Sequence, residues 1–190
     1  MNLHLSWDLF ILVFFAVVIA YSFIIGRSQT LKVILGTYVA ILCADGLGNL
    51  FAKFFASSAT FLKIMKFFAI GSEDQAIIFF KVLVFLILIV LIAVRGMFQV
   101  DSEEHGSMSI RLAILFLLGL MSAGLMMSTV LVFISGSSLI GTDITGANIL
   151  LDVYNNSRLV RIMIDYANFW FLFPGIVFVV LGIFTHKKSA

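Results

Sequence analysis

The chain is poor in the residues that build covalent cross-links and most metal sites. Cysteine occurs once and proline once among 190 residues, and the three histidines stand far apart at positions 4, 105 and 186. A single cysteine excludes both an intramolecular disulfide and a cysteine cage, and no two histidines have the spacing of a ligand pair on one helix. Cys43 is therefore expected to be a small packing residue. No metal and no other cofactor is expected.

Charge is scarce as well. Only 12% of the residues are charged and the net charge is +2, which leaves no basic surface of the kind that nucleic acid requires. Hydrophobic residues make up 62% of the chain and the mean hydropathy is +1.17, well above the range of soluble proteins. The sequence therefore predicts an integral membrane protein, with the lipid bilayer as its surroundings and no nucleic-acid partner.

Recognisable catalytic motifs are missing too. The chain contains no nucleophile elbow, phosphate-binding loop or zinc-protease helix. Its densest acidic run, DSEEH at residues 101–105, reads as a solvated polar loop between two spans. Because no paired acid and base can be found, a lipid-handling enzyme is the least favoured class and the chain is not expected to be an enzyme.

Long apolar runs are what the chain has most of. A spanning helix needs about 20 apolar residues. Five segments approach that length: residues 9–26, 33–52, 76–94, 112–142 and 166–185. The fourth is longer than a span requires, so its Ser/Gly-rich tail should emerge as a loop, and the fifth contains Pro174, which either kinks the helix or marks its entry into the membrane. We expect one all-α integral membrane domain over residues 1–190 with about five transmembrane helices, or four and a re-entrant or interfacial element.

Two connecting segments have the pattern of short amphipathic helices that lie in the membrane surface. In residues 59–71, Lys63 and Lys66 share one face and apolar residues share another. In residues 157–169, Arg158, Arg161 and Asp165 recur at i, i+3 and i+7 with apolar residues between them. The alternative is that both segments are the ends of neighbouring spans.

Asp45 is a charged residue inside the second apolar segment. A carboxylate at the centre of a spanning helix costs about 2.5 to 3.5 kcal/mol, so it should face a partner, a cavity or water. Lys53 and Lys81 are the candidate cationic partners, although Lys81 also lies near enough to the end of its segment to snorkel to the headgroups. Asp45 is thus neutralised at a tight helix contact, or ends the span, or belongs to an ion or proton site where the backbone unwinds.

Small residues surround Asp45. Gly36, Ala40 and Ala44 recur at every fourth position and form one stripe along a helix, and Gly46 and Gly48 follow the carboxylate. Such positions allow two helices to approach closely. We expect all five to be helix-packing residues.

The opening of the chain has a characteristic order of motifs. WDLFILVFF is followed by the Gly-Arg turn of IIGRSQ and then by LKVILGTYVAIL, and RLVRIMIDYANFWFLFP stands near the end. Through Asp8, Gly26, Arg27 and Gly36 the first fifty residues resemble the colicin V production protein family of small bacterial inner-membrane proteins, and the later stretch is similar to an amphipathic element of that family. The family usually stops at four spans, whereas this chain adds GIVFVVLGIF, and the approach to the family's fourth span is not recognisable in HGSMSIRLAI.

The resemblance implies a multi-pass protein of the bacterial inner (cytoplasmic) membrane, without established enzymatic activity and associated with toxin export and envelope integrity. It implies no catalytic residues. Asp8 and Arg27 also have a physical explanation, because a carboxylate at the start of the first span and a guanidinium past its end complement the helix dipole at the interface.

Two function classes remain. The first is a non-enzymatic assembly or scaffold subunit of an envelope, toxin-export or defence-related membrane complex. The second is a channel or an ion- or proton-coupled transporter subunit that uses Asp45. The chain has 21 phenylalanines, most of which should face lipid or a neighbouring subunit, and this favours a homo-oligomer or a place in a membrane complex.

Overall fold

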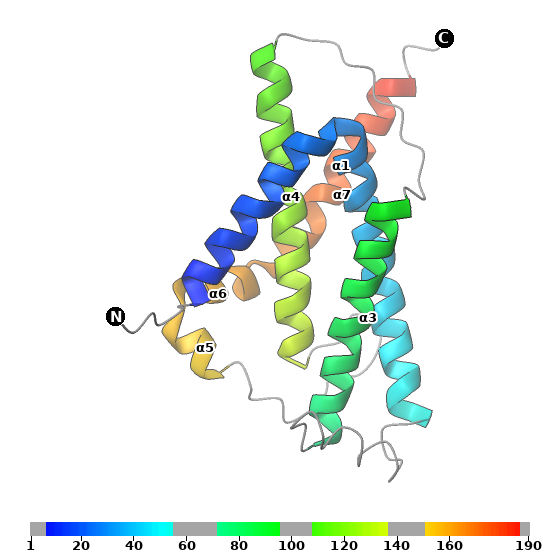
Figure 1. Ribbon diagram of the computed structural model, residues 1–190, viewed down its shortest axis with the longest axis vertical. Helices are drawn as coiled ribbons and strands as arrows, with labels where there is room; N and C mark the ends of the chain where they lie inside the picture. Colours follow the sequence, from blue (N-terminus) through cyan, green and yellow to red (C-terminus); the bar gives the residue numbers. More distant parts are fainter. Residues whose placement is uncertain (1–6, 55–71, 96–107, 137–150, 187–190) are drawn as a thin grey trace.

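The computed structural model describes residues 7–54, 72–95, 108–136 and 151–186, in which all the regular elements are α-helices (Figure 1). The helices are α1 (Trp7–Phe54), α3 (Glu73–Arg95), α4 (Met108–Ile134), α5 (Leu151–Asn156), α6 (Arg158–Asp165) and α7 (Ala167–His186). The expected all-α fold class is confirmed for these residues.

Helix α1 is bent sharply at Gly26. This residue has φ 79° and ψ 175°, a conformation that glycine adopts easily and other residues resist. The two halves of α1 run from this bend in different directions (Figure 1). The Thr30 hydroxyl donates to the Gly26 carbonyl at 2.9 Å and so supplies one partner for the backbone at the break. The predicted Gly-Arg turn therefore lies at this bend.

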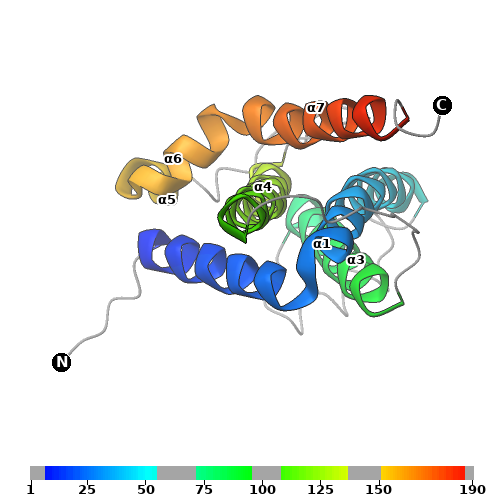
Figure 2. The same cartoon turned by 90° about the horizontal axis from the view of Figure 1, so that it is seen from above.

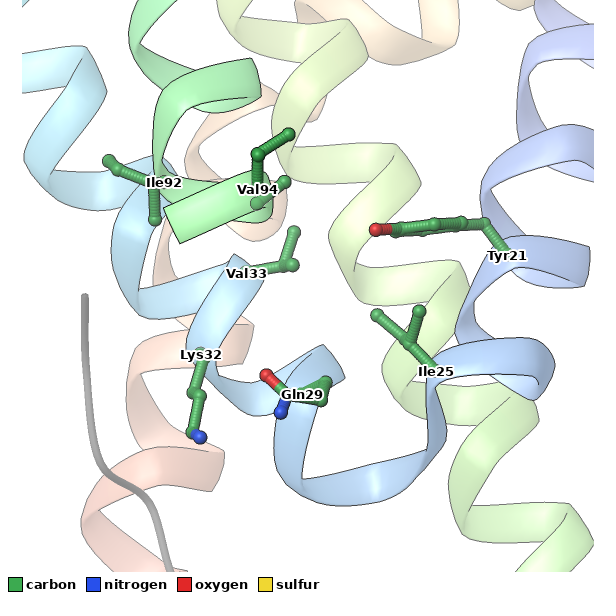
Figure 3. Close-up of a pocket in the computed structure, with 8 residues that line it drawn as sticks. Tyr21, Ile25, Gln29, Lys32, Val33, Ile92 and Val94 are labelled. Carbon is green, nitrogen blue, oxygen red and sulfur yellow. The ribbon is translucent and has the colours of Figure 1, made fainter. Parts of the chain in front are cut away.

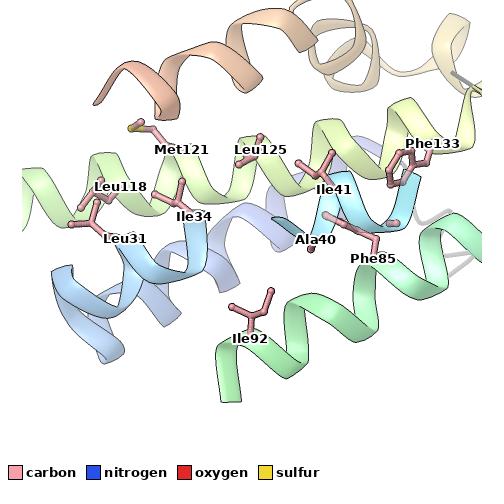
Figure 4. Packing of buried hydrophobic residues seen from close by; sticks show 11 residues of the cluster. Leu31, Ile34, Ala40, Ile41, Phe85, Ile92, Leu118, Met121, Leu125 and Phe133 are labelled. Atoms are coloured by element: carbon pink, nitrogen blue, oxygen red, sulfur yellow. The ribbon is translucent and has the colours of Figure 1, made fainter. Parts of the chain in front are cut away.

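Helix α4 lies at the centre, between the first half of α1 on one side and α6 and α7 on the other (Figure 2). It is buried without interruption from Met121 to Thr129, as expected for a helix that is covered on all sides. A core joins α1, α3 and α4 (Figure 4). Its largest members are Leu31, Ile34, Ile41, Phe85, Ile92, Leu118, Met121, Leu125 and Phe133.

Glycines on α4 mark the places where other helices cross it. A Cβ atom at Gly124 would lie 2.0 Å from Cε3 of Trp170 on α7, and one at Gly119 would lie 3.1 Å from the Cα of Ile19 on α1. Only a hydrogen atom fits at the first of these crossings. Close approach through small residues is the usual way in which apolar helices pack in membranes.

Three helices, α1, α3 and α4, are long and apolar enough to cross a membrane, and α6 with α7 adds a fourth if that pair, bent by 58°, counts as one span. Five separate spans are not shown among the described residues, because the first two apolar segments form one helix, α1, that bends at Gly26. Pro174 lies inside α7, and the break between α6 and α7 is at Tyr166 instead. The Tyr38 hydroxyl donates to the carbonyl of Phe171, in the turn before the proline.

The long fourth segment ends as a helix before its Ser/Gly-rich tail. Helix α4 stops at Ile134, and Gly136 follows in a turn with φ 82°. A glycine with positive φ just past the last helical residue is a common way to end a helix. The rest of the tail lies outside the described residues.

Candidate functional site

Asp45 and Lys81 form an ion pair inside the helix bundle. Lys81 Nζ donates to Asp45 Oδ1 at 2.6 Å, and the two side chains are 1% and 0% exposed. Asp45 belongs to the second half of α1 and Lys81 to α3, so the contact joins residues 36 positions apart in the chain. Each charge is thus neutralised by the other in a place that water does not reach.

Gly48 makes room for this pair. It lies on the same face of α1 as Asp45, and a Cβ atom there would stand 2.3 Å from Cγ of Lys81. The aliphatic part of the lysine therefore crosses α1 directly over the glycine. Its ammonium group reaches the carboxylate because no side chain at position 48 stands in the way.

An aromatic ring lies beside the lysine of this pair. Lys81 Nζ lies 5.9 Å from the ring centre of Phe133 on α4, within the range of a cation–π interaction. Phe85, on α3, packs edge-on against Phe133 with 5.9 Å between ring centres (Figure 4). The pair is buried from solvent, and an ion pair in such surroundings is held by strong attraction but has also given up its hydration.

Of the alternatives that the sequence left open for these charges, the structure shows the pairing of Asp45 with Lys81. Helix α1 continues through Asp45 and ends only at Phe54, so the span neither ends nor unwinds at the carboxylate. Lys81 does not snorkel to a helix end, because its ammonium group is drawn to Asp45 in the core. Lys53 does not join the pair: it is exposed in the last turn of α1, with its Nζ 5.8 Å from the ring centre of Phe54.

The small-residue stripe lies against α3. Gly36, Ala40 and Ala44 are buried, and a Cβ atom at Gly36 would come within 2.3 Å of Cγ2 of Ile92. Gly46 differs from the others, since a Cβ atom there would meet nothing within 4 Å. The expectation that Gly46 packs against a helix is therefore wrong, because it faces away from the contact.

Cys43 also points outward. It is a free, exposed cysteine, whereas the sequence suggested a packing residue. It lies between the buried positions Ile41 and Ala44 on a different side of α1. Its small size was therefore no guide to the face on which it lies.

Asp8 ties the start of α1 to the start of α6. Its Oδ1 accepts a hydrogen bond from the Ser157 hydroxyl at 2.6 Å and another from the backbone N–H of Leu159 at 2.9 Å. Ser157 is the N-cap of α6, and its hydroxyl oxygen accepts from the N–H of Val160 at 3.1 Å. Asp8 thus complements the N-terminus of α6 as well as that of its own helix.

Helix α6 presents its charges outward. Arg158, Arg161 and Asp165 are exposed, whereas Val160 and Met163 are buried. The predicted separation of polar and apolar faces is therefore present in this segment. The other amphipathic segment, with Lys63 and Lys66, lies outside the described residues.

The charged face of α6 is linked to α5. Arg161 donates to the carbonyl of Asn155 at 3.2 Å, and the Tyr154 hydroxyl donates to Asp165 Oδ1 at 2.8 Å. The hydrogen bond to this carboxylate raises the pKa of Tyr154 above its usual value, because it stabilises the protonated phenol. Both contacts fix the angle between the two short helices.

The remaining polar residues of the spans are scattered. Arg27 is half-buried just after the bend in α1. On α4, Ser128 donates to the carbonyl of Met163 at 3.1 Å, and Ser122 is buried with no hydrogen-bond partner for its hydroxyl among the described residues. In the same part of the chain, no three His, Cys, Asp or Glu side chains gather as a metal site would need.

No family model matches the chain, and no curated protein or solved structure matches it either. These comparisons neither support nor contradict the resemblance to the colicin V production protein family. The function of the chain is therefore inferred from the contacts between α1, α3 and α6.

Proposed function

We propose that the chain is a non-enzymatic scaffold or assembly subunit of a membrane complex, most simply in the bacterial inner membrane. In this proposal the two halves of α1, then α3, α4 and the α6/α7 pair, make five crossings. The lipid bilayer and further subunits, either copies of this chain or other proteins of an envelope, toxin-export or defence-related complex, are its partners.

The closed Asp45–Lys81 pair carries the proposal. A carboxylate that serves an ion or a proton must exchange its partner, yet this one is 0% exposed and lies 2.6 Å from a lysine. Removing either member would leave a charge in the core at a cost of about 3 to 5 kcal/mol. The pair is thus suited to hold α1 and α3 in one register, which is what a subunit with a fixed shape requires.

Exposed apolar surface supports a role in assembly. Large hydrophobic side chains project outward along the first half of α1 and along α3, among them Leu12, Val17, Ile24, Ile87 and Val90. Such faces suit either lipid or another subunit. The proposal assigns part of this surface to subunit contacts.

Cross-linking in native membranes tests the scaffold proposal. Cells that express the chain at its natural level are treated with a membrane-permeant cross-linker, and the products are separated by size. The proposal predicts a defined product larger than the 21.0 kDa monomer. Recovery of the monomer alone, at cross-linker doses that capture a known membrane oligomer, would contradict it.

A channel or an ion- or proton-coupled transporter subunit is the alternative, and the membrane-embedded position of Asp45 favours it. Ionisable residues in spanning helices often belong to ion paths. Proton and potassium flux into liposomes that contain the purified chain separates the two proposals. The alternative predicts flux that Asp45→Asn abolishes and Lys53→Gln preserves, whereas the scaffold proposal predicts no flux above that of empty liposomes.

A further inference from the structure

A pocket of about 210 Å³ lies in the angle between the two halves of α1, beside the C-terminal end of α3 (Figure 3). Both helices contribute apolar residues to its wall, with Ile25 and Val33 on α1 and Ile92 and Val94 on α3. It is smaller than the roughly 300 to 1,000 Å³ of typical small-molecule sites. It therefore has room for part of a flexible chain rather than for a whole organic cofactor.

Polar side chains also line the pocket. Tyr21 precedes the Gly26 bend and Gln29 and Lys32 follow it, so the three come from both halves of α1 (Figure 3). The two halves of α1 meet at the Gly26 bend on the same side of the bundle as the C-terminal end of α3. Tyrosine and lysine near the ends of membrane helices typically lie at the level of the lipid headgroups. The polar part of the pocket thus has the position of a headgroup site, with an apolar wall beside it.

Lys32 makes this pocket favourable for a negatively charged ligand. The side chain is half-buried, and within the part of the chain that the structure describes it forms no ion pair. An ammonium group that is partly withdrawn from water attracts an anion. A phosphate group beside an apolar chain satisfies both features of the pocket at once.

We propose that the pocket between the halves of α1 binds an anionic phospholipid, with the phosphate at Lys32 and Gln29 and part of an acyl chain against Ile25 and Ile92. This site is independent of the proposed scaffold function, because it uses neither the Asp45–Lys81 pair nor a subunit contact. A lipid held at the bend would also fill the angle that Gly26 opens between the two halves.

Native mass spectrometry of the full-length chain, released from lipid nanodiscs, tests the proposal. Phosphatidylglycerol and phosphatidylcholine with identical acyl chains are offered in equal amounts. The wild-type chain should retain phosphatidylglycerol preferentially. Lys32→Gln should reduce this preference about fivefold, the factor that corresponds to about 1 kcal/mol for one basic residue at an anionic surface. Lys53→Gln is the matched control, because it removes an exposed lysine from the far end of the same helix, and it should reduce the preference by less than Lys32→Gln does.

A second variant tests the apolar wall. Ala93 also lines the pocket, and Ala93→Phe should lower the retention of both lipids because the larger ring takes the space of the acyl chain. Circular dichroism and size-exclusion chromatography establish that this variant is folded. If Ala93→Phe does not fold, the comparison of Lys32→Gln with Lys53→Gln tests the phospholipid proposal by itself.

Several results would overturn the proposal. Equal retention of the two lipids by the wild-type chain would do so, as would equal effects of Lys32→Gln and Lys53→Gln. Displacement of phosphatidylglycerol by millimolar inorganic phosphate would indicate a site for a free anion. A loss of thermal stability in Lys32→Gln in lipid-free detergent would indicate that an acidic side chain of the protein itself holds this lysine.

Discussion

Asp45 and Lys81 are opposite charges on neighbouring helices, each withdrawn from solvent and 2.6 Å from the other. Their stabilising effect depends on both being present. The attraction between them offsets hydration that each has lost, and removing either member takes this compensation from the other. At the scale of the residue, this dependence separates a structural pair from a carboxylate that is free to bind an ion.

Neutralising the pair one member at a time should therefore cost more than neutralising both. We expect Asp45→Asn and Lys81→Met each to lower the free energy of unfolding in detergent by about 3 to 5 kcal/mol. The double variant should lose much less, because neither position then carries a charge that has lost the other. Lys53→Met, at an exposed position, should change stability by no more than about 0.5 kcal/mol. Losses that simply add in the double variant would show that the two charges do not act on each other.

Gly46 and Gly48 provide a matched test of packing within one turn of α1. Gly48→Ala puts a methyl group on the stem of Lys81, 2.3 Å from Cγ, and should lower stability by about 1 to 3 kcal/mol through crowding. Gly46→Ala meets no atom within 4 Å and should raise stability by up to about 1 kcal/mol, because alanine favours a helix more than glycine does. Thermal unfolding followed by circular dichroism measures both, and a shift of the same sign for the two variants would refute this packing.

At the scale of the element, Asp8 connects two helices whose contacting residues are 149 positions apart in the chain. The carboxylate accepts from Ser157 and from the backbone of Leu159, while Ser157 accepts from the backbone of Val160. The first turn of α6 is thus held by the first turn of α1. This link fixes where the exposed arginines of α6 lie relative to the bundle.

Asp8→Ala should loosen α6 while leaving the three-helix core intact. Losing a capping side chain costs about 0.5 to 2 kcal/mol, so the effect should be local. Hydrogen exchange should quicken at the backbone amides of Leu159 and Val160 and stay unchanged around Phe85. Asp165→Ala is the control, because Asp165 accepts from Tyr154 and lies at the other end of α6. Equal protection of the α6 amides in wild type and Asp8→Ala would contradict this role.

At the scale of the whole molecule, apolar composition was enough to predict membrane-length helices, and the motif IIGRSQ suggested a turn at Gly26. The sequence could not show which faces of the helices pack against each other. Two lysines were candidate partners for Asp45. Pairing with Lys81 depends on how α1 packs against α3 and on the space over Gly48. The partner of Asp8 lies on a distant helix, so no local spacing could reveal it.

Residue type alone also misled at particular positions. Gly46 is as small as Gly48, yet only Gly48 meets another helix, because the two lie on different faces of α1. Pro174 drew attention as a break, but the bend between α6 and α7 is at Tyr166. In both cases the packing of neighbouring helices, rather than the residue type, decided the outcome.

Complementation of a deletion strain by the Asp45→Asn/Lys81→Met double variant tests the central claim most directly. The strain lacks the natural gene, and envelope integrity is measured as resistance to detergent and exclusion of a dye. Immunoblotting of the membrane fraction ensures that equal amounts of each variant are compared. If the pair holds α1 and α3 together in a scaffold, the double variant should restore wild-type integrity although it has neither charge. A double variant that accumulates normally and yet fails to restore integrity would contradict the account and indicate that the charges themselves take part in transport.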